Sequence, residues 1–165
     1  MQFNLREIID IPGSSVGFET ELETDNLDFP SVKEYVSKPH AVGTVFNEAG
    51  VVHLRGEVEA DMVCICDRCG NDFESTKITE LDAVIVEENE DNRDDPELFF
   101  LDGDSIDLED IVSTCFILDM ETKFLCKEDC KGLCSKCGKN LNLGPCGCGK
   151  EIDPRFAVLE QLLDK

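Results

Sequence analysis

Ten cysteines are the residues of this 165-residue chain whose type and spacing could do chemistry. Eight of them form four close pairs: Cys66 with Cys69, Cys126 with Cys130, Cys134 with Cys137, and Cys146 with Cys148. Thiolates spaced in this way are typical ligands of zinc, which structural sites hold in a closed tetrahedron of four ligands. The four pairs therefore predict sites for one or two structural zinc ions.

Loop lengths indicate how the pairs combine. The last two pairs are separated by only eight residues, GKNLNLGP, so closing them around one ion costs little loop entropy. We therefore expect Cys134, Cys137, Cys146 and Cys148 to form a compact ribbon. The remaining two pairs would form a second site that joins distant segments. One alternative stays open, in which the two C-x-x-C-G turns, beginning at Cys66 and Cys134, share one ion.

Thiol chemistry is the main alternative to zinc. A thiol-based redox or metal-responsive protein would use Cys66 and Cys69, but redox C-x-x-C motifs belong to a strand-to-helix turn in a βαβ unit. Residues 66–69 instead lie between two expected strands. An iron–sulfur cluster also takes four thiolates, so the choice between zinc and iron stays open. The knuckle-like C-x-x-C-G sequences favour zinc.

The elements that must position these cysteines follow from hydrophobic periodicity. Residues 52–66 carry apolar side chains at almost every even position, which predicts a half-buried strand. Further strands are expected at 15–23, 41–46 and 73–86. The sequence NEAG at residues 47–50, which follows the strand expected at 41–46, is typical of a hairpin turn. The expected fold class is α+β: an antiparallel β-sheet body with flanking helices and a C-terminal cysteine-rich, zinc-ribbon-like module.

Two cysteines stand apart from the four pairs. Cys64 falls in phase with the buried face of its strand. Cys115 lies on the apolar face of an expected helix, whose other members are Leu108, Ile111 and Val112. We expect both thiols to be small core residues rather than ligands.

Three parts of the chain follow from this pattern. Residues 1–125 form an acidic sheet body with one helix, which Asp107 caps, and with an acidic loop at 87–97. Residues 126–150 form the metal module. Residues 151–165 are expected to form a C-terminal helix that packs on the body.

Charge is distributed unevenly over these parts. The formal net charge is -22, which favours basic partners and disfavours phosphate contact over the whole surface. Residues 126–150 hold five lysines against two acids, a net charge of +3, so the rest of the chain carries -25. The candidate RNA contacts are Lys127, Lys131, Lys136, Lys139 and Lys150. These lysines could instead only offset the charge of thiolate-bound zinc.

Several classes of protein are disfavoured. No apolar run approaches the ~18–20 residues of a membrane span, and the first ten residues lack a signal-peptide pattern. We therefore expect a cytoplasmic protein whose thiols stay reduced. His40 and His53 are isolated, and no glycine-rich phosphate loop is present. An enzyme is not expected.

Three segments carry a resemblance to a known family: IIDIPGSSVGFETEL, GEVEADMVCICDRCGNDF and LCKEDCKGLCSKCGKNLNLGPCGCGKEIDPRFAVLEQLL. Together they resemble the YceD family of large ribosomal RNA accumulation proteins, in the form seen in Gram-positive bacteria and their relatives, which carries an extra C-terminal cysteine ribbon. The resemblance implies a ribosome-biogenesis factor that supports accumulation or processing of large-subunit ribosomal RNA. The implied partners are a large-subunit ribosomal RNA precursor or a basic ribosomal protein. The oligomeric state is not indicated.

Overall fold

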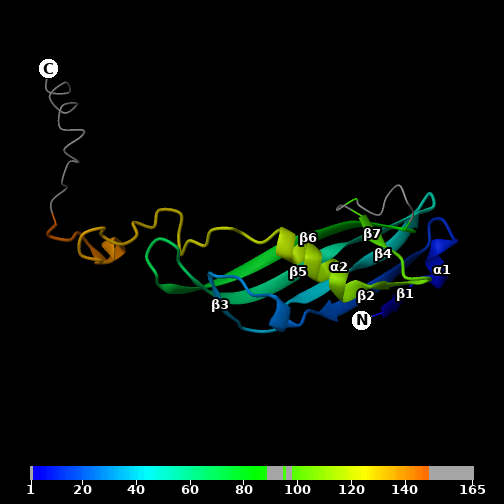
Figure 1. The fold of residues 1–165 in the computed structure, drawn as a ribbon, viewed down its shortest axis with the longest axis horizontal. Coiled ribbons are helices and arrows are strands. Elements are labelled where there is room, and N and C mark those ends of the chain that lie inside the picture. Colours follow the sequence, from blue (N-terminus) through cyan, green and yellow to red (C-terminus); the bar gives the residue numbers. More distant parts are fainter. Residues whose placement is uncertain (1, 89–94, 96–97, 149–165) are drawn as a thin grey trace, which may run out of the picture.

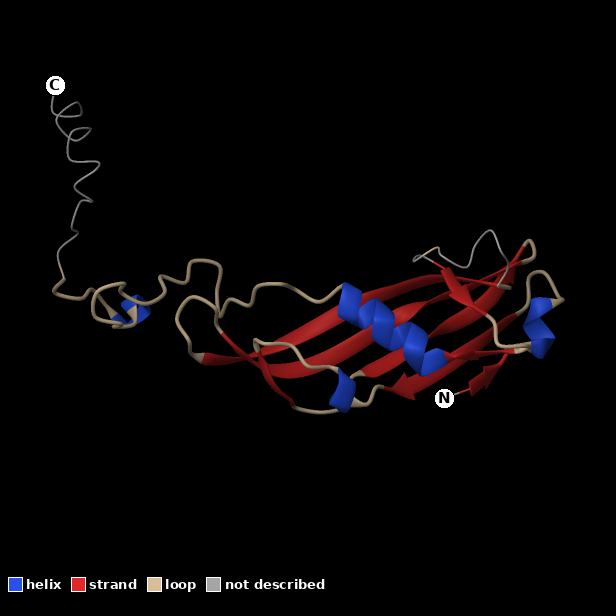
Figure 2. Cartoon of the chain, viewed as in Figure 1, coloured by secondary structure: helices blue, strands red, loops and turns tan. Residues whose placement is uncertain are grey.

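A six-stranded sheet forms the body of the protein (Figures 1 and 2). The computed structural model describes residues 2–88, 95 and 98–148. The sheet contains β2 (Ser15–Glu21), β3 (Val32–Tyr35), β4 (His40–Glu48), β5 (Val51–Ile65), β6 (Asp72–Val86) and β7 (Leu98–Phe100). A separate antiparallel pair contains β1 (Gln2–Asn4) and β8 (Ser105–Asp107). The helices are α1 (Arg6–Ile9) and α2 (Leu108–Leu118), with 3₁₀ turns η1 (Thr24–Asn26) and η2 (Leu141–Leu143).

The strand order is β2-β4-β5-β6-β7, and β3 pairs with the C-terminal half of β5 beyond the end of β4. All pairs in this sheet are antiparallel except β6 with β7, which is parallel. The expectation of a purely antiparallel sheet was therefore wrong at this edge. A parallel neighbour requires the chain to cross back along the sheet before it pairs, and the three-residue run of β7 carries no periodicity that would reveal this.

The predicted alternation of β5 is confirmed. Its even-numbered residues from 52 to 64 are buried, apart from the half-buried Gly56, and they face α2, which crosses this side of the sheet (Figure 2). Cys64 is fully buried in this core, and burial raises the pKa of its thiol. Cys115 packs against the same core but is only half-buried, and desolvation likewise raises its pKa. Neither thiol belongs to a cysteine cluster.

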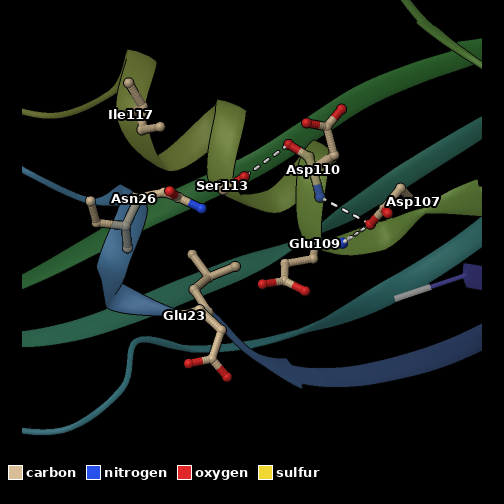
Figure 3. A pocket seen from close by; sticks show the side chains of 9 residues that line it. Glu23, Asn26, Asp107, Glu109, Asp110, Ser113 and Ile117 are labelled. Atoms are coloured by element: carbon tan, nitrogen blue, oxygen red, sulfur yellow. Dashed lines mark hydrogen bonds between the residues drawn. The ribbon is translucent and has the colours of Figure 1, made fainter.

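The helix expected after Asp107 is α2, and its cap is as predicted. The Asp107 carboxylate accepts hydrogen bonds from the backbone N–H groups of Glu109 (3.1 Å) and Asp110 (3.3 Å) (Figure 3). These bonds satisfy two of the unpaired donors at the helix start. A hollow of about 240 Å³ beside this turn is lined mainly by acidic and apolar side chains and contains no cysteine.

The NEAG turn between β4 and β5 is also confirmed. Ala49 and Gly50 both have positive φ, as the central residues of a type I′ hairpin turn require. The buried side chain of Asn47 holds this turn against α1: its Oδ1 accepts from the Gly50 N–H at 2.8 Å, and its Nδ2 donates to the carbonyls of Ile8 (2.9 Å) and Ile9 (2.7 Å).

Two glycines let β4 and β5 approach closely near the centre of the sheet. Gly43 and Gly56 are paired, and a Cβ on Gly56 would lie 2.2 Å from the Val42 carbonyl oxygen. We therefore expect Gly56→Ala to force the strands apart and to lower the free energy of unfolding by about 1–3 kcal/mol. Gly17→Ala on β2 is the matched control, because its Cβ would meet only the Gly43 carbonyl oxygen at 3.7 Å. Urea denaturation of both variants tests this, and equal stability of the two would contradict it.

Several expectations fall outside the described residues. They are the C-terminal helix at 151–165, the candidate contact Lys150, and most of the acidic loop at 87–97. Among the helices that are described, none combines the length and the apolar character that a membrane crossing demands.

Candidate metal centres

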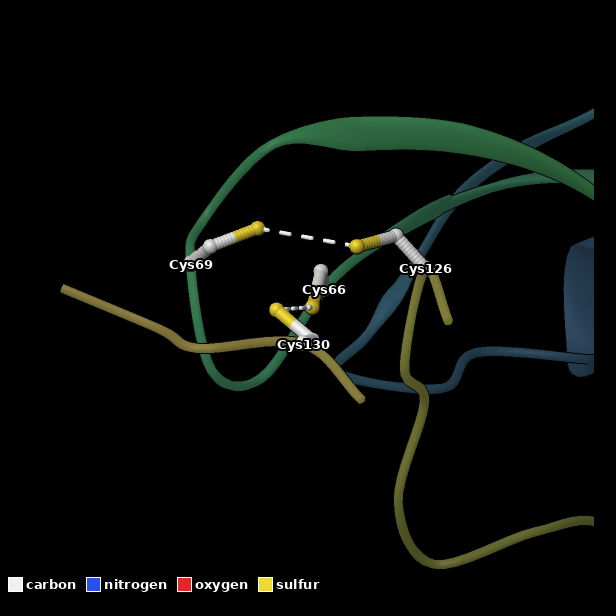
Figure 4. Close-up of side chains that lie close together, drawn as sticks. All are labelled: Cys66, Cys69, Cys126 and Cys130. Atoms are coloured by element: carbon white, nitrogen blue, oxygen red, sulfur yellow. Dashed lines mark hydrogen bonds between the residues drawn. The ribbon is translucent and has the colours of Figure 1, made fainter. Parts of the chain in front are cut away.

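Four cysteine sulfurs from two distant segments meet at the end of the β5–β6 hairpin (Figure 4). We call Cys66, Cys69, Cys126 and Cys130 the first tetrad. The Sγ atoms of Cys66 and Cys130 are 3.7 Å apart, those of Cys69 and Cys126 are 3.8 Å apart, and all four lie within 4.8 Å of one another. A regular tetrahedron with Zn–S bonds of about 2.3 Å has sulfurs about 3.8 Å apart. The spacing of these sulfurs fits a four-thiolate zinc site.

Asp67, in the turn of the hairpin, positions the segment that carries Cys126. Its backbone N–H donates to the Phe124 carbonyl at 2.9 Å, and its carboxylate accepts the Phe124 N–H at 2.6 Å and the Ser31 hydroxyl at 2.7 Å. The hydrogen bond from Ser31, followed by that from Phe124, lowers the pKa of Asp67. The two hydrogen bonds between Asp67 and the backbone of Phe124 fix the position of Phe124, and Cys126 follows two residues later.

Arg68 positions Cys130 in the same way. Its Nη1 donates to the carbonyl oxygens of Cys130 (3.0 Å) and Glu128 (3.3 Å), while its own carbonyl accepts the Leu133 N–H at 3.2 Å. Gly132 has a φ of +69°, and a Cβ there would lie 2.9 Å from the Arg68 carbonyl oxygen. Glycine is therefore needed where the chain leaves the first tetrad.

The sulfurs of the first tetrad differ in how readily they ionise. Burial opposes the thiolate of Cys66, but backbone N–H groups of Cys126, Cys69 and Arg68 outweigh it and lower its pKa to about 6. The Asn142 side chain lowers the pKa of Cys130. Burial, reinforced by the neighbouring thiols, raises the pKa of Cys126 to about 12. Four close sulfurs repel one another when charged, and a bound divalent cation would relieve that repulsion and deprotonate all four.

The other four paired cysteines form a second cluster. Cys134, Cys137, Cys146 and Cys148, the second tetrad, have sulfurs within 4.8 Å of one another. They are more exposed than the first tetrad and lie in the ribbon that extends beyond the hairpin (Figure 1). The two clusters are the groupings that loop length favoured, and the alternative in which both C-x-x-C-G turns share one ion does not match the geometry.

Both C-x-x-C-G turns have the same backbone geometry. The N–H of Gly70 donates to the Cys66 carbonyl at 2.8 Å, and that of Gly138 donates to the Cys134 carbonyl at 2.8 Å. Both glycines have positive φ. As at Cys66, backbone N–H groups within the turn, here those of Cys137 and Lys136, lower the pKa of Cys134 to about 6. The repeated turn therefore favours ionisation of its first cysteine in each cluster.

Four of the five candidate RNA contacts lie in the described part of the chain: Lys127 and Lys131 flank Cys130 of the first tetrad, whereas Lys136 and Lys139 lie on either side of Cys137 of the second. Lys127, Lys131, Lys136 and Lys139 are all exposed. Lys127 lies 3.7 Å from the Asp129 carboxylate, and the Lys139 Nζ donates to the Pro145 carbonyl at 3.0 Å. Lys139 therefore has a structural contact within the ribbon in addition to its charge.

Sequence reasoning missed three residues that support the tetrads: Asp67, Arg68 and Asn142. Asp67 and Arg68 are the two residues between the cysteines of C-D-R-C, and Asn142 lies in the eight-residue spacer, which was considered only for its length. The signal in the sequence that could have identified Asp67 and Arg68 was their polar character at the two x positions of C-x-x-C. Metal sites need hydrogen-bond partners around their ligands, and polar residues can supply them.

The family model described as "Large ribosomal RNA subunit accumulation protein YceD" matches residues 54–163, which include both tetrads. The chain belongs to the YceD family. The match begins within β5, so it covers the hairpin that carries Cys66 and Cys69 as well as the ribbon.

Curated relatives include uncharacterized proteins of Mycobacterium tuberculosis and Mycobacterium bovis. Each is 30% identical over 115 residues, which is 68% of this chain and 56% of the relative. The chain thus spans little more than half the length of these relatives. No solved structure matches the chain.

Proposed function

We propose that this YceD-family protein is a non-enzymatic, zinc-stabilised ribosome-biogenesis factor that acts in the cytoplasm and supports accumulation of large-subunit ribosomal RNA. The observation that carries the proposal is the family match over the segment that holds both tetrads. On this reading the metal has a structural role. The first tetrad fastens the basic ribbon to the end of an acidic sheet, so that two oppositely charged surfaces keep a defined arrangement.

The outer face of the sheet, on the side opposite α2, has a composition that favours a basic protein as one binding partner. Glu57 on β5 and Glu80 on β6 lie directly opposite each other, a like-charge pairing that costs stability. Val42 and Ile78 are 36% and 57% exposed on the same face. A face that combines carboxylates with exposed apolar side chains suits a basic polypeptide and repels RNA phosphates. Direct RNA contact would then use the lysines of the ribbon.

The alternative of a thiol redox or metal-responsive protein is less well supported. Cys66 has the low pKa that such a role needs, yet Cys66 is only 1% exposed and Cys69 4% exposed. Reactive cysteines in redox proteins are partly accessible to their substrates. The burial and the four-sulfur arrangement favour a structural site.

Sedimentation through a ribosome gradient tests the proposed function. The tagged protein is expected to travel with large-subunit precursors, and depletion of the protein should lower the ratio of large-subunit to small-subunit ribosomal RNA. A variant with the first tetrad disrupted should no longer travel with these precursors, and it should not restore the RNA ratio in depleted cells. Protein that stays at the top of the gradient, together with an unchanged RNA ratio after depletion, would contradict the proposal.

A further inference from the structure

Asn142 connects the two tetrads. It lies in η2, within the spacer between the two cysteine pairs of the second tetrad, yet its amide touches the first tetrad. Its Nδ2 donates to the Sγ of Cys130 at 3.3 Å, and its Oδ1 accepts the Lys131 N–H at 2.9 Å. Asn142, from the loop of the second tetrad, therefore hydrogen-bonds the sulfur of Cys130 in the first tetrad and the backbone of the next residue, Lys131.

The position of Asn142 depends on the fold of that loop. The Asn140 Oδ1 accepts hydrogen bonds from both the backbone N and the Nδ2 of Asn142, each at 2.9 Å. The Leu141 N–H donates to the Gly132 carbonyl at 2.9 Å, and Asn140 forms a β-bridge with Leu133. These contacts hold the middle of the loop against residues 130–133, while Cys137 and Cys146 hold its two ends.

We propose that the second tetrad is a control site for the first: metal bound by the second tetrad orders residues 138–145, and this loop, through Asn142, raises the affinity of the first tetrad for metal. The inference rests on the proposed zinc binding. An amide donor stabilises a metal-bound thiolate, and outer hydrogen-bond partners of this kind change metal affinity by about 10–100-fold. Without metal at its ends, the loop must lose conformational entropy before it can offer that donor.

Linkage makes the effect reciprocal. A coupling that raises the affinity of the first tetrad when the second is filled must raise the affinity of the second by the same factor when the first is filled. Asn142 is thus a positioning residue, which acts on the metal through Cys130 rather than by coordination. The ribbon gains a role beyond presenting lysines, because its metal state sets how firmly it is fastened to the sheet.

Metal titration of the full chain tests the coupling. Zn²⁺ affinity is measured by competition with a chromophoric chelator, and Co²⁺ absorption is assigned to each tetrad from variants that lack the other. Asn142→Ala should weaken the first tetrad about 10–100-fold. Leu143→Ala is the matched control, since this neighbour is 81% exposed and should leave the affinity unchanged. Circular dichroism confirms that the sheet stays folded in each variant.

A double-mutant cycle separates this inference from simple loss of structure. Cys134→Ser with Cys146→Ser should weaken the first tetrad as Asn142→Ala does, and adding Asn142→Ala to that background should have little further effect. First-tetrad affinity that is unchanged in Asn142→Ala, or additive effects in the cycle, would overturn the coupling while leaving zinc binding intact. Wild-type protein that binds neither Zn²⁺ nor Co²⁺ would overturn the zinc proposal itself.

Discussion

Cys66→Ser is expected to remove one of two zinc ions per chain and to lower the melting temperature by roughly 8–16 °C, if about 4 kcal/mol is lost. This magnitude follows from chain entropy, because the first tetrad joins residues as far apart as Cys66 and Cys130, which are 64 positions apart. The cross-link closes a loop that contains β6 and α2, so its loss acts on the whole body.

Cys134→Ser should have a smaller and more local effect. The second tetrad closes only the short spacer between Cys137 and Cys146, and the sheet retains its own buried core. We expect the ribbon to lose its structure while the melting transition of the sheet moves much less than in Cys66→Ser.

The measurements are elemental analysis of protein purified in reducing buffer without added metal, and thermal melting of both variants. Cys115→Ser is the matched control, because this thiol lies outside both tetrads. Equal, global loss of structure in the two tetrad variants would argue against separate sites. Less than about half an equivalent of any metal in the wild type would exclude a structural metal altogether.

Reversing the charge of Lys131 and Lys136 to glutamate should weaken binding to large-subunit RNA precursors, most of all at low salt. Each phosphate contact contributes about 0.7–0.9 to the slope of log affinity against log salt, so losing two contacts should reduce that slope by about 1.4–1.8. Both lysines are exposed on the ribbon. Lys139 is left unchanged, since its contact with the Pro145 carbonyl gives it a structural role.

Filter binding over a range of salt concentrations measures the slope. The charge control reverses Lys33 and Lys38, two exposed lysines of the sheet body that pair with Asp72 and Glu23, and makes the same change in net charge. Circular dichroism checks that this variant stays folded. A control variant that loses as much affinity would indicate a general charge effect rather than a contact surface. Unchanged RNA binding in the ribbon variant, with its metal content intact, would direct attention to a protein partner on the outer face of the sheet.

Local patterns in the sequence were enough to predict several parts of this protein. Strict alternation identified β5, a capped apolar stripe identified α2, and NEAG identified the turn between β4 and β5. The grouping of the cysteines also followed from the sequence, because an eight-residue spacer makes one set of four local and leaves the other four to one another. Each of these features depends on residues that are close in the chain, where periodicity and loop entropy act directly.

Only the tertiary structure decided how the distant segments meet. The parallel pairing of β7, the place of β3 beside β5, and the contacts of Asp67 and Arg68 with residues 124–133 all depend on the path of the chain between elements. The contact of Asn142 with Cys130 has the same origin. Short strands carry no period, and a polar side chain in a loop has many possible partners until packing selects one. The sequence could therefore indicate which cysteines belong together, whereas the fold determined which side chains surround and connect the two clusters.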